Sequence, residues 1–530
     1  MGRSKLFSSL KLISFIQKPN VRYCSCVPAK EDACAKDGSG TQSSAKKGLV
    51  LGVYQGEDKV ELSPDAADFD QKFGGKIGKH LNEVSSVLKL GKAFLMTDVD
   101  SDYSAIALTS LGPRAPGYND CEALDETREN ARIGVGAGVS LLEQLGCDHV
   151  VVDRTDAPDA AAEAAHLAAW RFDEFKTEGE HKQPVVVPYS EVGSWYTGAV
   201  LGRCQNWARF LSDMPANKMT PTDFAQECLN VLCPLGVRVL AHERSWIEAQ
   251  GMKAFLAVAQ GSCTPPMMLQ LEYTADSAPP TLLTAKGTTY DSGGLCLKSH
   301  EDMVQARGCM AGAAVVVAAI RACAELKARV NLRALIPLCE NMISGQCMKV
   351  GDVVTALNGL SIQIEDTDNE GRLMLADALV YGQALYKPRM LLDVATLTRG
   401  MQLATGEGAF GVFVNNPGPW AGIRRAGAAT GDRPWLFPTW HFFEKRITDD
   451  PAVDLRNRGS GKASACKAAA FLKKFVCTDW MHMDVSGVGR MARNAPPYLR
   501  PGRMSGRPTR TLASYLMQTG EQPEQQPAPV

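Results

Sequence analysis

Residues 281–298 read TLLTAKGTTYDSGGLCLK, an apolar run followed by a glycine-rich turn that carries Lys286, Asp291 and Lys298. The apolar part suits a buried strand. A second charged turn, IEDTDNEGRL at residues 364–373, also follows a short apolar run and opens a helical pattern. Strands that end in charged turns are typical of an α/β sheet with its functional site along one edge. We therefore expect the two turns to lie together.

The second turn places Asp366, Asp368 and Glu370 ahead of Arg372. Three neighbouring carboxylates are unfavourable unless cations compensate them. The chain has no HExxH zinc helix, and its glycine-rich turn lacks the Gly-Lys-Ser/Thr ending of a phosphate loop. A carboxylate site suits manganese, magnesium or paired zinc ions. The two turns therefore predict a metal cage of carboxylates and lysines, although an aspartate before two glycines is, taken alone, usually a turn.

Composition describes a large globular chain of 530 residues, 45% of them hydrophobic. At about 100–200 residues per domain, this length predicts two or three domains. Lys and Arg number 57 and Asp and Glu 58, which gives no reason to expect nucleic acid or an acidic membrane surface as a partner. We find no apolar run of the roughly 18–20 residues that a membrane span needs. The 16 cysteines are scattered, which favours a reducing compartment and core thiols.

Both ends of the chain differ in composition from the rest. Residues 1–25 are basic, rich in serine and free of acids, with apolar residues at helical spacing, which predicts a mitochondrial transit peptide. The alternative is a disordered basic tail on a cytoplasmic protein. We expect residues 26–47 to form a flexible linker and residues 518–530 a disordered tail.

Between these ends the pattern predicts two α/β domains. Residues 48–190 alternate short apolar runs with helical patterns at 125–145 and 157–175, which indicates a smaller N-terminal α/β domain with a largely parallel sheet and no catalytic constellation. Residues 191–517 predict a larger C-terminal α/β domain of catalytic type with a central, mostly parallel sheet. Its expected strands are 237–241, 267–273, 331–338 and 390–396, and its expected helices are 309–326 and 370–386.

The charged turns and their surroundings resemble a known family, the leucyl aminopeptidases, which are dinuclear metalloexopeptidases. The resemblance runs from about residue 48 to 515 and rests on five segments: NWARFLSDMPANKMTP (206–221), KGTTYDSGGLCLK (286–298), DTDNEGRL (366–373), DVATLT (393–398) and AAAFLKKFV (468–476). It implies a smaller N-terminal domain on a catalytic C-terminal domain, peptide substrates and a homohexamer.

The resemblance also implies a role for each matched residue. Two divalent ions, zinc or manganese, would activate a water for attack on the peptide carbonyl. The tighter ion would be held by Lys286, Asp291 and Glu370, and the exchangeable one by Asp291, Asp368 and Glu370. A lysine ligates a metal only as the neutral amine, so the pKa of Lys286 would have to fall through burial beside the cations.

The remaining matched residues would serve the reaction and the substrate. Lys298 would stabilise the oxyanion, and Arg372 would hold a bicarbonate that acts as general base. Thr396, Leu397 and position 399 would line the substrate pocket. The simpler alternatives are that Asp368 and Glu370 cap the following helix and that Lys298 is a solvated lysine.

Several positions depart from the family pattern. Cys309 stands where the family has a metal-binding aspartate; it is either a ligand that favours zinc or an ordinary buried thiol. Arg399 replaces a glycine at the pocket, where a guanidinium would fill the pocket or compete with the metals for carboxylates. Asp366 replaces an asparagine and could offset Arg399. Ala311 replaces a glycine, and Lys467 lies in a segment that is usually uncharged.

Two hypotheses follow from these matches and departures. The first is an active aminopeptidase that trims N-terminal residues from peptides. The second is a structural descendant with slow or no hydrolysis, similar to the sperm leucyl aminopeptidases, which accumulate in sperm mitochondria. Because Cys309 and Arg399 both alter the site, we favour impaired catalysis.

Overall fold

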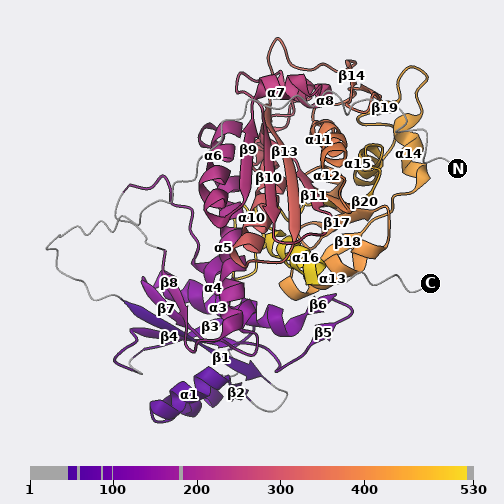
Figure 1. Ribbon diagram of the computed structural model, residues 1–530. Helices are drawn as coiled ribbons and strands as arrows, with labels where there is room; N and C mark the ends of the chain where they lie inside the picture. The colour runs from indigo at the N-terminus through magenta and orange to yellow at the C-terminus, as the bar shows by residue number, and fades with distance from the viewer. Residues whose placement is uncertain (1–45, 56–59, 85–87, 98–99, 178–182, 522–530) are drawn as a thin grey trace.

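The computed structural model describes residues 46–55, 60–84, 88–97, 100–177 and 183–521, which form a smaller and a larger domain (Figure 1). The smaller domain occupies the lower part of the view and the larger domain the upper part. The predicted leader, nearly all of the predicted linker and most of the predicted tail lie outside the described residues. The prediction of a disordered tail is wrong for residues 518–521, which form the end of a helix, Thr509–Glu521.

The smaller domain is built on a sheet with the strand order β3-β4-β1-β7-β8, and β2 pairs with β1. Strands β4, β1, β7 and β8 are parallel, whereas β2 and β3 are antiparallel to their neighbours. The strands are β1 (Lys47–Gln55), β2 (Val60–Leu62), β3 (Ala93–Met96), β4 (Ala105–Ser110), β7 (His149–Val152) and β8 (Val185–Pro188), with a small pair β5 (Tyr118–Asn119) and β6 (Leu124–Asp125) beside them.

The helices of this domain are α1 (Pro64–Lys72), α2 (Lys76–Val84), α3 (Glu126–Gln144) and α4 (Pro158–Ala169). The helix expected at 157–175 is therefore shorter than predicted. It ends because Trp170 adopts an extended backbone, with φ −67° and ψ 137°, and its buried ring lies 4.0 Å from the guanidinium carbon of Arg209. The helical pattern of the sequence did not reveal this packing.

The larger domain is organised by a nine-stranded sheet with the order β18-β17-β20-β16-β11-β13-β10-β9, and β12 pairs with β13. Strands β20, β16, β11 and β13 are mutually parallel, which confirms the predicted mixed α/β fold with a mostly parallel central sheet. The strands are β9 (Arg238–His242), β10 (Met267–Thr274), β11 (Thr281–Ala285), β12 (Gly287–Asp291), β13 (Asn331–Asn341), β16 (Met390–Ala395), β17 (Phe410–Val414), β18 (Pro434–Leu436) and β20 (Asp479–Asp484).

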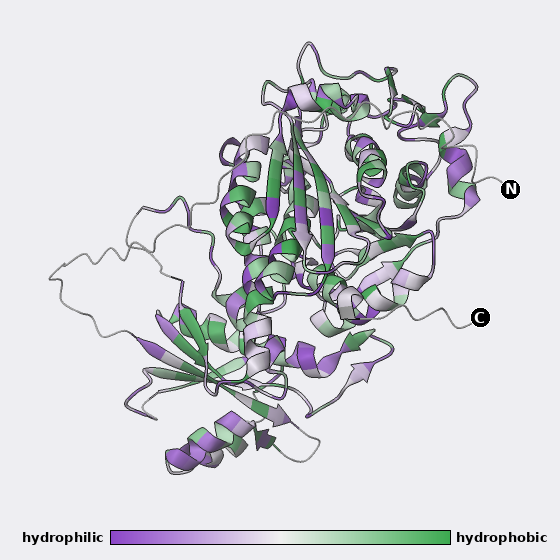
Figure 2. Ribbon diagram, in the orientation of Figure 1, coloured by the Kyte–Doolittle hydropathy of each residue, from purple (hydrophilic) through white to green (hydrophobic). Residues whose placement is uncertain are grey.

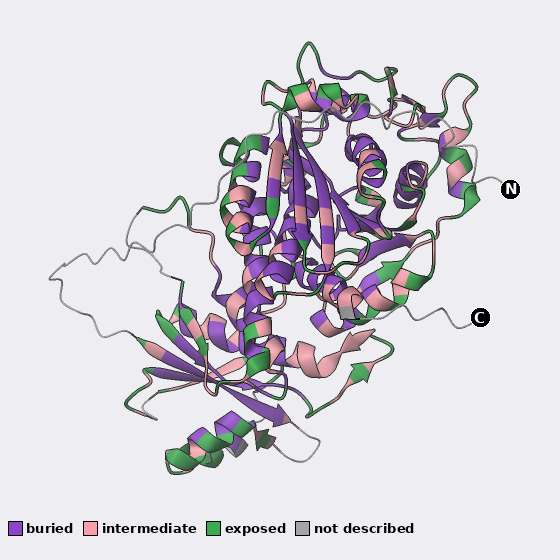
Figure 3. Cartoon of the chain, in the orientation of Figure 1, coloured by how far each residue is buried: buried purple, intermediate pink, exposed green. Residues whose placement is uncertain are grey.

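Two hydrophobic cores cover the two faces of this sheet. Neighbouring residues of β11 show the alternation, since Leu283 belongs to one core and Leu282 to the other. The first core packs under α5 (Gly193–Asp213), α6 (Pro221–Leu232), α10 (Ala311–Glu325), α13 (Gly418–Thr430) and α16 (Thr509–Glu521). The second packs under α7 (Arg244–Ala249), α8 (Lys253–Ala259), α11 (Gly371–Tyr386), α12 (Arg399–Thr405), α14 (His441–Thr448) and α15 (Ser464–Lys473). Figures 2 and 3 show apolar, buried residues along the strands between these layers.

Three short strands lie outside the two main sheets: β14 (Val353–Thr355), β15 (Ser361–Gln363) and β19 (Leu455–Arg456). Strand β15 leads toward the second charged turn. Its neighbour β19 precedes Asn457, which binds that turn. The pairing of β15 with β19 therefore brings Asn457 against the turn.

One helical segment, Ala306–Glu325, is long and apolar enough to cross a membrane by length and composition. The sequence shows no unbroken apolar run of this length because Arg307 and Arg321 limit the run to residues 308–320. Of its most apolar window, 89% is buried inside the fold. The segment therefore serves here as a core helix of the larger domain, and it carries Cys309 at its start.

Candidate metal centre

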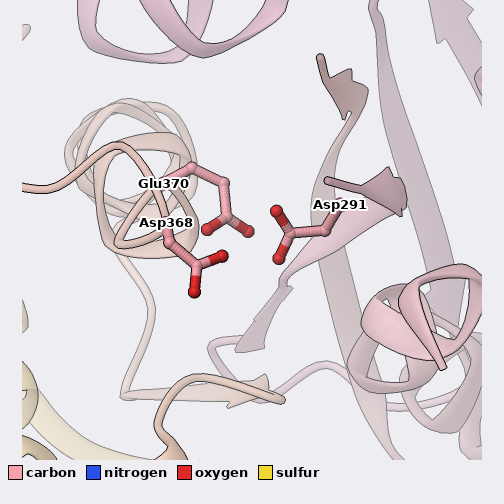
Figure 4. A group of neighbouring side chains, drawn as sticks. All are labelled: Asp291, Asp368 and Glu370. Carbon is pink, nitrogen blue, oxygen red and sulfur yellow. The ribbon is translucent and has the colours of Figure 1, made fainter. Parts of the chain in front are cut away.

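The two charged turns meet at the carboxyl edge of the parallel strands, as predicted. Asp291 is the last residue of β12, and Asp368 and Glu370 precede α11. Each of these three residues offers a carboxylate oxygen, and the three oxygens lie within 4.8 Å of one another. Figure 4 shows the three carboxylates pointing toward one common space.

Two lysines lie between these carboxylates. Lys286 Nζ is 2.6 Å from Glu370 Oε1 and 3.5 Å from Asp291 Oδ2. Lys298 Nζ is 2.9 Å from Asp291 Oδ2 and also pairs with Asp368. Five charged groups from two distant turns thus form one cluster, four of them buried and Asp368 partly exposed, in the cage-like arrangement that the sequence predicted.

The protonation of the cage follows from this pairing. Burial lowers the pKa of Lys286, but the negative charges of Glu370 and Asp291 outweigh burial and hold its pKa above the ordinary value. Burial raises the pKa of Asp291, yet Lys298 and Lys286 together bring it well below its usual range. Burial alone therefore does not deliver the neutral amine that metal ligation needs. Lys286 can lose its proton only when other cations take over the carboxylates.

Hydrogen bonds from uncharged side chains orient the carboxylates. The Thr288 hydroxyl donates to Glu370 Oε1 at 3.0 Å, and the Asn341 amide donates to Asp291 Oδ1 at 3.0 Å. The sequence analysis did not assign either residue. Thr288 lies inside the quoted turn, and Asn341 ends β13, the parallel strand beside β11 and β12. Its position at the carboxyl end of that parallel strand is the feature of the sequence that could have identified Asn341 as a residue of the site.

The carboxylates suit a divalent cation. Glu370 Oε2 is buried and accepts no hydrogen bond. An unpartnered buried carboxylate oxygen is costly unless a cation compensates it. Asp291, Asp368 and Glu370 together offer the hard oxygen ligands that manganese, magnesium and zinc accept. The residues present therefore fit a metal at this triad.

Cys309 lies beside the triad and not within it. It belongs to the short helix η4 (Ala306–Met310), is fully buried, and receives a contact of 3.6 Å from Nη2 of Arg490. Burial raises the pKa of the Cys309 thiol, and the opposing effect of Arg490 is smaller. These features favour the alternative of a protonated, buried thiol over that of a thiolate ligand. The sequence analysis missed Arg490, which follows the parallel strand β20 and so reaches the same edge of the sheet.

Arg372 is a buried arginine without a carboxylate partner in the described part of the chain. Its Nη1 donates to the carbonyl of Asn457 at 2.6 Å, its Nη2 donates to Asn369 Oδ1 at 2.9 Å, and its Nε has no partner. Burial lowers its pKa to about 10, against the raising effect of Asp366 and Glu370. An incompletely paired guanidinium of this kind can receive a small anion, which agrees with the bicarbonate role implied by the resemblance.

The predicted pocket residues separate into two buried residues and an exposed one. Thr396 donates from its hydroxyl to the carbonyl of Cys309 at 2.7 Å, and its own carbonyl accepts from Lys286 at 3.2 Å. Leu397 is buried beside it. The side chain of Arg399, at the start of α12, is 75% exposed, and Nη1 lies 3.3 Å from Asp302 Oδ2. Arg399 therefore pairs with Asp302, and no ion pair joins it to the metal carboxylates among the described residues, which argues against the competition that was one of its two expected effects.

The other departures from the family pattern serve local structure. Asp366 does not offset Arg399; its carboxylate accepts from the backbone N–H of Asp368 and lies 4.0 Å from Arg458. Lys467 is buried and donates to three backbone carbonyls, those of Gly459, Ser460 and Gly461, at 3.1, 3.2 and 2.7 Å. Ala311 is buried at the start of α10, next to η4.

Comparisons with known proteins agree with this geometry. Residues 50–179 match the N-terminal domain of the cytosol aminopeptidase family, and residues 206–513 match its catalytic domain. The cytosol aminopeptidase of Xenopus tropicalis is 40% identical over 494 residues, which cover 90% of this chain and 94% of the relative. That of Sus scrofa is 41% identical over 486 residues, which cover 89% and 92%.

Solved structures share the fold over nearly the whole chain. The bottromycin maturation enzyme BotP in complex with Mn has a TM-score of 0.76 at 26% identity and covers 90% of this chain and 100% of its own. A mutant of tomato leucine aminopeptidase has a TM-score of 0.75 at 24% identity, covers 91% and 95%, and supports the fold alone. The matched domains, the relatives and the metal cage confirm the resemblance: the chain belongs to the cytosol aminopeptidase family, whose members are metal-dependent aminopeptidases.

Proposed function

We propose that this protein removes N-terminal residues from peptides in a metal-dependent reaction, and that its turnover is low for a member of its family. The cage of Asp291, Asp368, Glu370, Lys286 and Lys298 supports the reaction. One observation supports the low turnover: a buried cysteine, with a guanidinium against its sulfur, stands where the family resemblance implies another metal-binding carboxylate.

The residues of the cage have distinct roles in this proposal. Asp291, Asp368 and Glu370 would hold a divalent ion, zinc or manganese, which would supply Lewis acidity and a water of lowered pKa. The ammonium of Lys298 faces the same space and is placed to donate to the oxyanion that forms on the substrate. Arg372, whose Nε is unpartnered among the described residues, would hold a bicarbonate, which would supply a general base beside the water.

Hydrolysis of a leucyl amide by the purified protein, with manganese and then with zinc, tests this proposal. We expect measurable turnover that lies below the ordinary enzyme range of about 1–1000 per second. The double variant Cys309→Asp with Arg490→Met restores a carboxylate, removes the guanidinium beside it and should raise the rate. Glu370→Gln removes a carboxylate of the cage and should abolish turnover, which controls for contaminating peptidases. If the natural protein turns over at ordinary rates, its catalysis is not impaired. If Glu370→Gln leaves the rate unchanged, the measured hydrolysis does not come from the proposed active site.

The alternative is a structural protein without useful turnover, as in the sperm leucyl aminopeptidases. The observation that favours it is an exposed apolar surface, here named the aromatic edge, on the outermost strand β18 and the start of α14. Its members are exposed by 41–68%: Trp435, Leu436, Trp440 and Phe442. A surface of this kind suits contact with another protein. The occupant that we propose is a second copy of this chain within a homohexamer.

Light scattering of the purified protein tests this assembly. Phe442→Asp should lower the mass of the particle because it places a charge in the aromatic edge. Phe175→Asp, a matched change of an exposed phenylalanine in the smaller domain, should leave the mass unchanged. A monomeric natural protein, or equal effects of both variants, contradicts the proposed contact.

We further propose that residues 1–25 direct the protein to mitochondria, on the basis of their basic, acid-free composition. Fractionation of cells, followed by N-terminal sequencing of the protein, tests this. A mature protein in mitochondria that has lost the leader supports it. An intact Met1 on a cytoplasmic protein contradicts it.

A further inference from the structure

Arg490 is a charged residue of the metal centre that neither the charged turns nor the resemblance assigns. It follows β20, whose neighbour in the sheet is β16, and so it reaches the edge where Thr396 and Cys309 lie. Its Nη2 is 3.6 Å from Cys309 Sγ, and its Nε is buried without a hydrogen-bond partner. Within the described residues no carboxylate forms an ion pair with it.

This lack of a partner identifies Arg490 as a cation of the cluster. A guanidinium stays protonated in proteins. A partly buried guanidinium must be compensated by charges nearby. Cys309, which Arg490 contacts, is joined to the cage through Thr396. The hydroxyl of Thr396 donates to the carbonyl of Cys309 at 2.7 Å, and the carbonyl of Thr396 accepts from Lys286 Nζ at 3.2 Å. These contacts place the guanidinium beside the cage.

Cys309 and Arg490 also change the charge of the cluster. Asp291, Asp368 and Glu370 contribute three negative charges. Lys286, Lys298 and Arg490 contribute three positive charges. A carboxylate in place of Cys309, with no arginine beside it, would leave an excess of negative charge that favours two divalent ions. The pair of Cys309 and Arg490 therefore removes one ligand and adds one cation at the same place.

We propose that Arg490 acts as a resident cation that replaces one of the two divalent ions of the family, so that this centre takes a single metal. The proposal deepens the proposed function, since it rests on the carboxylates holding a metal. The retained ion is held by Asp291, Asp368 and Glu370. A second ion on the side of Cys309 would lack a carboxylate and face a guanidinium at close range, and this repulsion should weaken its binding by about 100-fold or more.

Metal content tests the proposal independently of catalysis. Equilibrium dialysis of the full-length protein against manganese, and separately against zinc, gives the number of ions bound per chain. We expect about one for the natural protein and about two for the double variant Cys309→Asp with Arg490→Met. Cys309→Asp with Arg490→Lys keeps the positive charge and should remain near one. Circular dichroism and thermal unfolding show whether each variant is folded.

A matched control shows whether the change in metal content is specific to Arg490 or follows from the loss of any nearby arginine. Arg493→Met makes the same change three residues further along the chain, at an exposed arginine, and should leave the content at one. Two ions on the natural protein, or one on the folded double variant, overturn the role of Arg490 and leave the proposed function standing. No bound metal on any variant overturns both the proposed function and this inference.

Discussion

The side-chain amide of Asn341 donates one hydrogen bond to Asp291 Oδ1 and a second to the carbonyl of Thr367, each 3.0 Å long. It thereby ties the first charged turn to the second. Asn341 is buried at the end of β13, a strand that was predicted for its apolar pattern and not for any site role. The sheet thus holds the two turns together through a neutral residue.

Asn341→Leu should lower the affinity for manganese by about 10–100-fold, the usual effect of losing a group that orients a metal ligand. The reason is that Asp291 loses a donor and becomes free to rotate. Calorimetric titration with manganese measures the change. Asn331→Leu makes the same substitution at the opposite end of β13, where the amide donates to the carbonyl of Ala278, and should leave the affinity unchanged. Equal affinities for Asn341→Leu and the natural protein contradict the orienting role.

Glu370→Gln should destabilise the fold far more than Asp368→Asn. Glu370 is fully buried and is the closer carboxylate of the buried Lys286, so its neutralisation leaves that ammonium with only Asp291 at 3.5 Å, at a cost of about 3–5 kcal/mol. The side chain of Asp368 is 38% exposed, and loss of its charge should cost about 1 kcal/mol or less. Urea unfolding with excess chelator measures both values without a contribution from bound metal. Similar losses in the two variants contradict this account of the cage.

Arg399→Ala should change the free energy of unfolding by about 1 kcal/mol or less, because Arg399 and Asp302 form an exposed ion pair. It should also leave the number of bound metal ions unchanged, since the guanidinium extends away from the carboxylates. Urea unfolding and metal analysis check the two parts. If Arg399→Ala binds more metal than the natural protein, Arg399 does compete with the metals for the carboxylates, as the sequence suggested.

The sequence predicted the meeting of the two charged turns for a physical reason. Both turns follow strands of one sheet, and the carboxyl ends of parallel strands share an edge. The hydrophobic periodicity likewise predicted β9, β10, β11, β13 and β16 of the larger domain and both helices beside the site, but it did not predict β17, β18 or β20. Lys286, Asp291, Asp368 and Glu370 could therefore be placed together from the sequence.

The direction of long side chains could not be predicted in the same way. Arg399 stands at the position expected to block the pocket, but its side chain follows the start of α12 toward Asp302. Arg490 is 181 residues from Cys309 in the chain, and only the pairing of β16 with β20 brings them together. Neither outcome depends on periodicity or motif spacing. The arginine that alters the centre is therefore Arg490.

Lys467→Met should destabilise the protein by about 1–3 kcal/mol, the range for buried polar groups that lose a partner. Three carbonyls between Gly459 and Gly461 accept from this single ammonium. Asn457 lies two residues before this segment, and its carbonyl accepts a hydrogen bond from Arg372. Because loss of the Lys467 ammonium should loosen this part of the chain and so Arg372, the change should also weaken the binding of bicarbonate. Urea unfolding and bicarbonate titration measure the two effects. Lys473→Met, on the same helix at a half-buried site, should stay within about 0.5 kcal/mol.

The imidazole of His482 should give the fold a stability that falls as the pH rises above about 6.5. His482 is fully buried, and Nδ1 lies 2.5 Å from Asp393 Oδ1. Burial lowers the pKa of His482, but the charge and hydrogen bond of Asp393 outweigh it and hold the pKa above the ordinary value. His482 keeps its proton to a higher pH in the folded state than in the unfolded state. This contribution to stability is therefore complete below the pKa of the unfolded state and is lost as the pH rises through the pKa of the folded state.

His482→Gln should therefore flatten the decline of unfolding free energy above pH 6.5, whose slope from one group is at most about 1.4 kcal/mol per pH unit. His166 is the matched control, because burial, with a smaller contribution from Arg203, lowers its pKa to about 4. His166 therefore affects the free energy of unfolding between about pH 4 and the pKa of the unfolded state, and in that range stability is lost as the pH falls. His166→Gln should change that acid range and leave the slope above pH 6.5 intact. Urea unfolding across both ranges measures the curves, and a natural slope above pH 6.5 that survives His482→Gln contradicts the assignment to Asp393 and His482.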